Sequence, residues 1–274
     1  MRADQTSPTP PPESGSLAVR KVDFAFPGGR APVIRGLSFE VASGEFFVLL
    51  GPSGCGKSTV LNLIAGFEHP TRGAVLAGGR AVEAAGRDRV VIFQDSDSLY
   101  GWMNVLDNVA FPLRVTRTSR RSRHERARAA LKLVGLQGHE EKYPSELSGG
   151  MKQRTQLARA LVLDSPILLM DEPFAALDAQ TRSILQDELM QLSAQMRRTV
   201  LFITHDIGEA ILLGDRVAVM HAGPASSIRE ILRIELPRPR RRGAPEFGAL
   251  YERIHQSISE EVQRALRPED SLLR

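Results

Sequence analysis

The sequence predicts an α/β fold, in which a mostly parallel sheet covered by helices carries an antiparallel β-layer and an inserted α-helical subdomain. Short continuous apolar runs, each ending in a small or polar residue, are typical of strands buried on both faces. Alternating apolar positions precede these runs, and helical periodicity fills the stretch between the second and the third. The runs are FFVLL at 46–50, RVVIF at 89–93, ILLMD at 167–171 and VLFIT at 200–204.

The bulk composition is that of a folded protein. The 274 residues are 42% hydrophobic and 25% charged, so the chain can bury its own core. A single cysteine, Cys55, excludes an internal disulfide, and the N-terminal segment has no basic start followed by an apolar core. We therefore expect a cytoplasmic protein. The apolar runs are far shorter than the ~20 residues of a membrane-spanning helix, so any membrane association comes through a partner.

The chain divides into three parts by composition. Residues 1–16 are rich in proline and predict a disordered lead-in. Residues 17–236 hold the folded domain, with the helical subdomain at about 95–165. It starts with an antiparallel hairpin or two, with turns at Gly28–Gly29 and Ser43–Gly44. Residues 237–274 form an extension that ends in an amphipathic helix, whose apolar positions are Phe247, Leu250, Ile254, Ile258, Val262 and Leu266.

An arginine-rich segment, RTSRRSRHERAR at 117–128, accompanies a net charge of +4. Such a cluster can bind phosphate backbones, or it can be the solvated face of a helix. Glu125 and the apolar stripe that follows favour the solvated amphipathic helix.

The segment GPSGCGKST follows the strand FFVLL and leads into a helical pattern, which is the context of a phosphate-binding P-loop. Glycines let backbone N–H groups approach phosphate oxygens, Lys57 supplies a charge for the β- and γ-phosphates, and Ser58 offers a hydroxyl to Mg²⁺. The alternative is an ordinary glycine-rich turn, and Cys55 serves simply as a small side chain. We expect a P-loop NTPase core in which ATP contacts Gly51, Pro52, Ser53, Gly54, Cys55, Gly56, Lys57, Ser58 and Thr59.

Two further segments carry chemistry. ILLMDEP is a buried strand that ends in adjacent carboxylates, so Asp171 can hold Mg²⁺ and Glu172 can polarise a water for attack on the γ-phosphate. LSGGMKQR begins a helix with Ser148 as N-cap, and Gly149 and Gly150 expose N–H groups that would face an anion. The alternative is an ordinary capped helix with a flexible start.

With these segments in order, the chain resembles the ATPases of ABC transporters over roughly residues 17–220. LSGGM resembles their signature sequence, with Met151 in place of the usual glutamine. The remaining family positions are Gln94 as the Q-loop glutamine that senses Mg²⁺, Ala176–Leu177–Asp178 as the D-loop, His205 as the switch histidine on the γ-phosphate, and Phe26, or alternatively Phe24, as the aromatic ring on adenine.

The resemblance implies a head-to-tail dimer, in which Ser148, Gly149 and Gly150 of one copy cover the ATP held by the P-loop of the other. It also implies transmembrane permease subunits on the inner face of the membrane and, indirectly, a solute-binding protein. Met151, PFAALD at 173–178 and LPRPR at 236–240 resemble the importers of nitrate, sulfonate, taurine or related small organic compounds. Trp102 is then a permease contact, or alternatively a packed core tryptophan.

Two rival functions remain open at this stage. A soluble ABC-type ATPase acting on nucleic acid usually has tandem domains or a long coiled-coil insertion, and this chain has neither. A small-molecule kinase would leave LSGGM, Asp178 and His205 without a role. No nucleic-acid partner is therefore expected.

Overall fold

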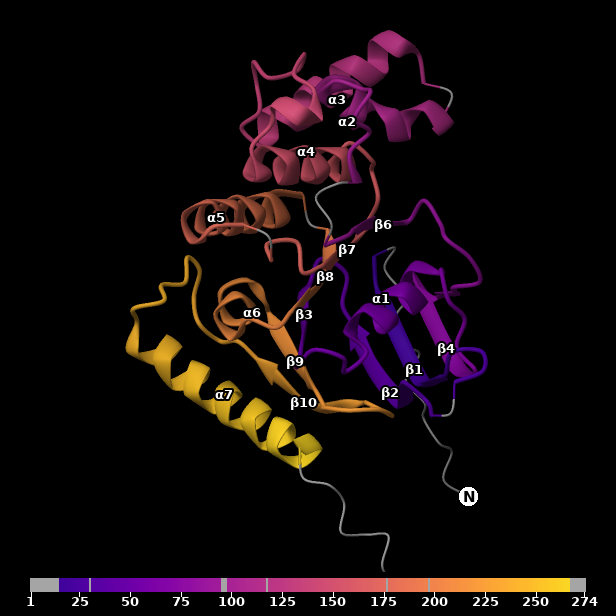
Figure 1. Ribbon diagram of the computed structural model, residues 1–274, viewed down its shortest axis with the longest axis vertical. Coiled ribbons are helices and arrows are strands. Elements are labelled where there is room, and N and C mark those ends of the chain that lie inside the picture. Colours follow the sequence, from indigo (N-terminus) through magenta and orange to yellow (C-terminus); the bar gives the residue numbers. More distant parts are fainter. Residues whose placement is uncertain are drawn as a thin grey trace, which may run out of the picture.

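The computed structural model describes residues 15–29, 31–94, 98–116, 118–175, 177–196 and 198–266. In Figure 1 a lobe of helices stands above two β-sheets, and a long helix near the C-terminus lies beside the larger sheet. Of the disordered lead-in predicted at residues 1–16, residues 1–14 lie outside the described ranges, as do Arg117 and Ala176. Within these ranges no helix is long and apolar enough to cross a membrane.

The larger sheet has six strands in the order β10-β9-β3-β8-β7-β6. Its neighbours pair in parallel from β9 to β6, and β10 pairs antiparallel with β9 at one edge. These pairings confirm the prediction of a mostly parallel sheet. All residues of β3 and β8 are buried, because both faces of the sheet are covered. The strands are β3 (Phe46–Leu50), β6 (Arg89–Ile92), β7 (Ile167–Asp171), β8 (Thr199–Thr204), β9 (Arg216–Met220) and β10 (Ile228–Arg233).

The smaller sheet is antiparallel, in the order β2-β1-β4-β5. Strands β1 and β2 form the expected hairpin. The prediction of a second hairpin at the Ser43–Gly44 turn is wrong, because this turn leads from β2 into β3 of the larger sheet. β3 is apolar on both faces and therefore lies in the sheet that is covered on both faces. The strands are β1 (Leu17–Phe24), β2 (Ile34–Val41), β4 (Arg72–Ala77) and β5 (Arg80–Ala81).

Helix α1 (Lys57–Ala65) and the inner face of the smaller sheet share an apolar cluster with one face of the larger sheet. Phe39 of β2 stacks on Phe47 of β3, with ring centroids 5.1 Å apart and an interplanar angle of 3°. This packing holds the loop between β3 and α1 at the carboxyl end of the parallel strands, where ligands of α/β sheets bind.

The helical lobe contacts β6 at the edge of the larger sheet, and a second apolar cluster joins the lobe to the other face of that sheet. Helix α3 buries Ala127, Ala130 and Leu131 and leaves most of its arginines exposed or half-buried, so the described part of the arginine-rich segment is an amphipathic surface helix. The lobe consists of α2 (Val105–Ala110), the 3₁₀ helix η2 (Phe111–Thr116), α3 (Arg120–Leu133), the 3₁₀ helix η3 (Pro144–Glu146) and α4 (Gly149–Leu161).

Three further helices follow the lobe in the chain, namely α5 (Ala179–Met196), α6 (Ile207–Leu213) and α7 (Pro245–Leu266). Helix α7 packs against α6 and β9, with Phe247 and Ile254 buried in the interface. Leu250 and Ile258 are partly buried against the same cluster, so the apolar stripe of the terminal segment faces the protein.

Candidate active site

The loop from Gly51 to Gly56 joins the last residue of β3 to the first of α1. A Cβ atom on Gly51 would lie 2.9 Å from Sγ of Cys55 and 3.2 Å from Cβ of Met220, so no larger residue fits there. Gly56 precedes the helix with a φ of 93°, a conformation that L side chains rarely adopt. Cys55 points into the core, where burial raises the pKa of its thiol. Ser53 and Ser58 are exposed, and Pro52 and Thr59 are half-buried.

Lys57 folds back over this loop. Its Nζ donates to the carbonyl oxygens of Gly51, at 2.8 Å, and Pro52, at 2.9 Å. The same atom lies 4.0 Å from Oε1 of Glu172, and the side chain is only 6% exposed. A cation is therefore held between the loop and the end of β7, where it can neutralise phosphate charge.

The two carboxylates at the end of β7 have different surroundings. Burial raises the pKa of Asp171, and a hydrogen bond from Ser58 opposes that rise. Glu172 has a φ of 42°, which is uncommon for a residue other than glycine and costs of order 1–3 kcal/mol. Its N–H donates to the carbonyl oxygen of Ile203 at 3.0 Å, so pairing with β8 continues through this turn.

His205 follows β8 and faces Glu172. Its Nδ1 atom lies 3.0 Å from Oε2 of Glu172. Lys57, Glu172 and His205 are therefore brought together from three separate segments, at the carboxyl ends of β3, β7 and β8. This group can bind a phosphate and orient a water beside it.

The two candidate aromatic residues differ in exposure. Phe26 is 47% exposed, whereas Phe24 is 2% exposed in the core of the smaller sheet. The rings meet edge to face, with centroids 5.0 Å apart. Only Phe26 therefore presents a free face on which a base could stack.

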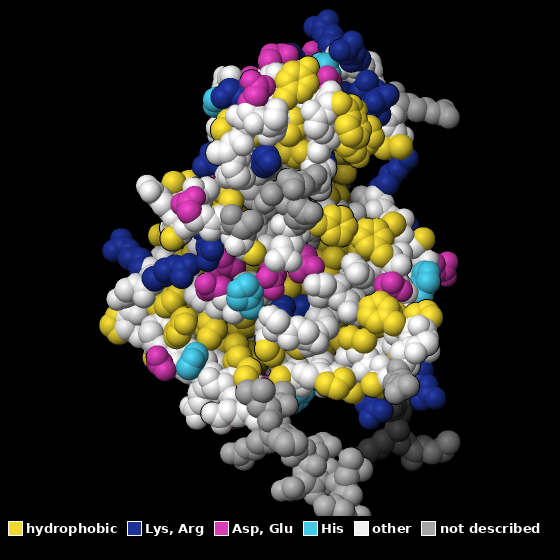
Figure 2. Space-filling view, in the orientation of Figure 1, with side chains coloured by type: hydrophobic (Ala, Val, Ile, Leu, Met, Phe, Trp, Pro, Cys, Tyr) yellow, Lys and Arg dark blue, Asp and Glu magenta, His cyan; other side chains and the backbone are white. Residues whose placement is uncertain are grey.

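Gln94 follows β6 and is exposed, next to Asp95–Asp97, which lie outside the described residues. The preceding Phe93 is also exposed and stacks with Phe67, with ring centroids 6.1 Å apart. In Figure 2 hydrophobic side chains gather on this flank, below the helical lobe. Trp102 is 75% exposed, so the alternative of a packed core tryptophan is wrong.

Ser148 caps α4, and its Oγ accepts from the N–H of Met151 at 3.3 Å. Gly149 has open space around its Cα, and Gly150 packs closely on Thr181 of α5. Among the described residues no hydrogen bond joins these three positions to the phosphate loop of the same chain. The start of α4 and the loop therefore remain separate within one copy, with α4 in the lobe of Figure 1.

Asp178 precedes α5, and its carboxylate accepts from the N–H groups of Gln180 at 3.1 Å and Thr181 at 3.0 Å. The hydrogen bond from the Thr181 backbone lowers the pKa of Asp178. The carboxylate caps the helix that packs on Gly150, so the predicted D-loop and signature positions are neighbours.

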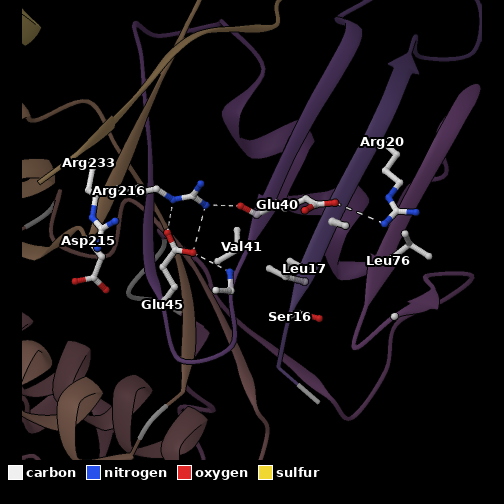
Figure 3. Close-up of a pocket in the computed structure, with 13 residues that line it drawn as sticks. Ser16, Leu17, Arg20, Glu40, Val41, Glu45, Leu76, Asp215, Arg216 and Arg233 are labelled. Carbon is white, nitrogen blue, oxygen red and sulfur yellow. Dashed lines mark hydrogen bonds and ion pairs between the residues drawn. The ribbon is translucent and has the colours of Figure 1, made fainter. Parts of the chain in front are cut away.

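A cavity of about 840 Å³ lies at the opposite end of the sheets (Figure 3). It lies beside the amino ends of β3 and β9, away from the phosphate loop. Several of its charged groups already have partners, since Arg216 contacts Glu45 at 2.6 Å and Arg20 contacts Glu40 at 3.5 Å. This cavity is a gap between two sheet edges, and the nucleotide chemistry lies elsewhere.

Two buried polar residues beside His205 were missed by sequence reasoning. Thr204 donates to Oε2 of Glu209 at 2.7 Å, and both side chains are buried. A signal for them existed, since Glu209 interrupts an otherwise apolar helix start, GEAILL. An acid in such a position needs buried hydrogen-bond partners.

Comparison with known proteins agrees with this geometry. Residues 34–175 match the family model described as ABC transporter. An uncharacterized ABC transporter ATP-binding protein of Methanocaldococcus jannaschii is 46% identical over 244 residues, 89% of this chain and 91% of the relative. A nitrate import ATP-binding protein of Synechococcus elongatus is 41% identical over 261 residues, 94% and 95% of the two chains.

Among solved structures, the fold matches a dimeric ATP-binding cassette in a post-hydrolysis state bound to ADP and Pi. The TM-score is 0.70 at 28% identity, over 81% of this chain and 100% of the other. The phosphate loop, the paired carboxylates and the histidine thus lie in a fold that has been seen with products of ATP hydrolysis. The chain belongs to the ABC transporter family, as an ATP-binding and ATP-hydrolysing subunit.

Proposed function

We propose that this ATPase works as a homodimer on the inner face of the cell membrane and energises an importer of nitrate, sulfonate, taurine or a related small compound. The nitrate import protein of Synechococcus elongatus, similar over nearly the whole of both chains, supports this substrate class. The dimeric cassette structure supports the pairing of two copies. The named relatives give no support to the alternative of an ATPase that acts on nucleic acid.

The observation that carries the proposal is the position of Glu172 between Lys57 and His205. We assign Lys57 to the β- and γ-phosphates, Glu172 to the water that attacks the γ-phosphate, and His205 to the γ-phosphate itself. Phe26 would stack on adenine. The other nucleotide contacts would come from the loop Gly51–Thr59, and from Ser148, Gly149, Gly150 and Asp178 across the dimer.

Mg²⁺ fits the donors at this site, because it prefers hard oxygen ligands and the Asp171 carboxylate already contacts the Ser58 hydroxyl. Ser58, Asp171 and the amide oxygen of Gln94 would hold it together with phosphate oxygens. The chemistry that such an ion supplies when bound is neutralisation of phosphate charge.

Our division into a lead-in at 1–16, an ATPase domain at 17–236 with a helical subdomain at about 95–165, and an extension at 237–274 also remains a proposal.

Reconstitution tests the proposed function. The chain would be combined in proteoliposomes with the permease and the solute-binding protein encoded beside it, and ATP-dependent uptake of nitrate, taurine and an alkanesulfonate would be measured. The expected result is uptake of at least one of these compounds, and this uptake stops in the Glu172→Gln variant. ATP hydrolysis without uptake of any of them would contradict the substrate class.

A further inference from the structure

The segment Leu236–Arg242, which we call the arginine strap, connects β10 to α7 and lies along α6. Arg240 is buried, and its guanidinium donates to the carbonyl oxygens of Ile211 at 2.7 Å and Gly214 at 2.5 Å. Burial lowers the pKa of Arg240 to about 10, so the group stays charged at neutral pH. A cation at the carboxyl end of a helix is favourable, and the strap is thereby fixed to that end of α6.

Arg242 reaches a different part of the structure. Its Nη2 atom donates to Oε1 of Gln186 on α5 at 3.0 Å. Its other terminal nitrogen lies against Gly208, in the first turn of α6. The strap therefore contacts both ends of the helix that begins immediately after His205 and Asp206.

Gln186 is fully buried, so both ends of its amide need partners. The amide nitrogen donates to Oε1 of Glu209 at 3.0 Å, and the amide oxygen accepts from Arg242. Within the described part of the chain, Arg242 is the one side chain that donates to this oxygen. Without Arg242 a buried acceptor loses its partner, and the amide is free to rotate away from Glu209.

Glu209 continues this connection to the backbone on both sides of His205. Its Oε2 accepts from Oγ1 of Thr204 at 2.7 Å, and the same hydroxyl accepts from the N–H of Asp206 at 3.0 Å. The N–H of Glu209 donates to Oδ1 of Asp206 at 2.9 Å. The buried carboxylate of Glu209 thus holds Thr204 directly and holds the backbone of Asp206 through the Thr204 hydroxyl.

We propose that Arg242 is a positioning residue for ATP hydrolysis: through Gln186 and Glu209 it fixes the turn that carries His205 against Glu172. The inference rests on the proposed function, because it takes its meaning from the role assigned to His205. Arg242 contacts neither residue directly, so it acts on geometry and not on chemistry. A displaced imidazole slows hydrolysis while ATP stays bound to the phosphate loop.

The test compares Arg242→Ala, Arg242→Lys and Arg241→Ala in the purified full-length chain, by steady-state ATP hydrolysis and thermal unfolding. Arg241 is the matched control, since it is exposed and no hydrogen bond or ion pair joins its side chain to another described residue. Arg242→Ala is expected to lower kcat about tenfold, with KM for ATP within about twofold. Arg242→Lys, which can still donate to Gln186, recovers most of the loss, and Arg241→Ala behaves as the unmodified protein.

Two further variants distinguish a failure of this inference from a failure of the proposed function. The first is Gln186→Ala, alone and combined with Arg242→Ala. The double variant is expected to lose no more kcat than the worse single variant, because each substitution breaks the same hydrogen bond between Arg242 and Gln186. Equal kcat for Arg242→Ala and Arg241→Ala would overturn the inference, as would a loss that comes with a higher KM and a lower unfolding midpoint. His205→Ala is measured in parallel: normal hydrolysis there would overturn the proposed role of His205, whereas its loss beside an active Arg242→Ala overturns the inference about Arg242 alone.

Discussion

The Nδ1 atom of His205 lies 3.0 Å from Oε2 of Glu172, although the two residues are 33 positions apart in the chain. They meet because β7 and β8 are neighbours in the sheet and both end at its carboxyl edge. Oε1 of Glu172 lies 4.0 Å from Nζ of Lys57. The carboxylate is therefore held from both sides, and its position depends on a histidine and a lysine from different segments.

The first prediction concerns Glu172. Glu172→Gln keeps the shape of the side chain but removes the base, so hydrolysis is expected to fall by at least about a hundredfold while ATP still binds. Phosphate release measures the first quantity, and calorimetry with ATP measures the second. The control is Glu235→Gln, an exposed carboxylate that follows β10. Turnover at the normal rate would remove Glu172 from its proposed role.

Lys57 is expected to affect binding as well as turnover. Lys57→Ala removes a cation from the phosphate loop, and a hydrogen bond to a charged group is worth about 1.5–3 kcal/mol, so the Kd for ATP should rise about 10- to 100-fold. Calorimetry checks this, with the exposed Lys132→Ala on α3 as the matched control. An unchanged affinity would count against the phosphate loop as the nucleotide site.

Local patterns predicted the parts of the fold that carry the chemistry. β3 and β7 are apolar throughout their buried positions, because each is covered on both faces, and this makes them visible in the sequence. Two strands were missed: β9, although it holds the short apolar run VAVM at 217–220, and β10, whose sequence IREILR mixes charged and apolar residues and gives no continuous apolar run. The partner of β1 across the smaller sheet, β4, comes from beyond α1, and no local pattern encodes such a pairing.

The residues of the candidate site also fall into two groups, those that a local sequence pattern identifies and those that only the tertiary structure brings together. The residues of the phosphate loop are contiguous, so their spacing alone identifies the loop. The contact between Glu172 and His205 depends on the order of strands, and the connection from Arg242 through Gln186 depends on how the strap crosses α6. These are tertiary contacts between distant segments, which hydrophobic periodicity cannot reveal.

Trp102 is predicted to serve a partner and not the fold. It is 75% exposed, and its ring contacts Tyr100 with centroids 5.3 Å apart. Trp102→Ala should change the free energy of unfolding by less than about 0.5 kcal/mol and leave ATP hydrolysis by the isolated subunit unchanged. Binding to the permease should weaken by about 2 kcal/mol or more, as for a buried aromatic hot spot. Co-purification with permease-containing membranes measures this, and undiminished recovery of the variant would argue against a permease contact.

The last prediction separates the two phenylalanines of the first hairpin. Phe26→Ala removes an exposed ring, and base stacking is worth about 1–3 kcal/mol, so the affinity for ATP should fall about tenfold with little change in stability. Phe24→Ala instead empties a buried position and should cost about 3–5 kcal/mol of unfolding free energy.

Binding of different nucleotides distinguishes stacking on the base from contact with the phosphates. Binding of ATP, GTP and inorganic triphosphate would be measured for Phe26→Ala, because a ring that stacks on a base contributes nothing to triphosphate binding. Equal losses for ATP and triphosphate would show that Phe26 acts on the loop and not on the base. Loss of ATP affinity in a folded Phe24→Ala protein, with Phe26→Ala unaffected, would transfer the adenine contact to Phe24, whose ring meets the Phe26 ring edge to face at a centroid distance of 5.0 Å.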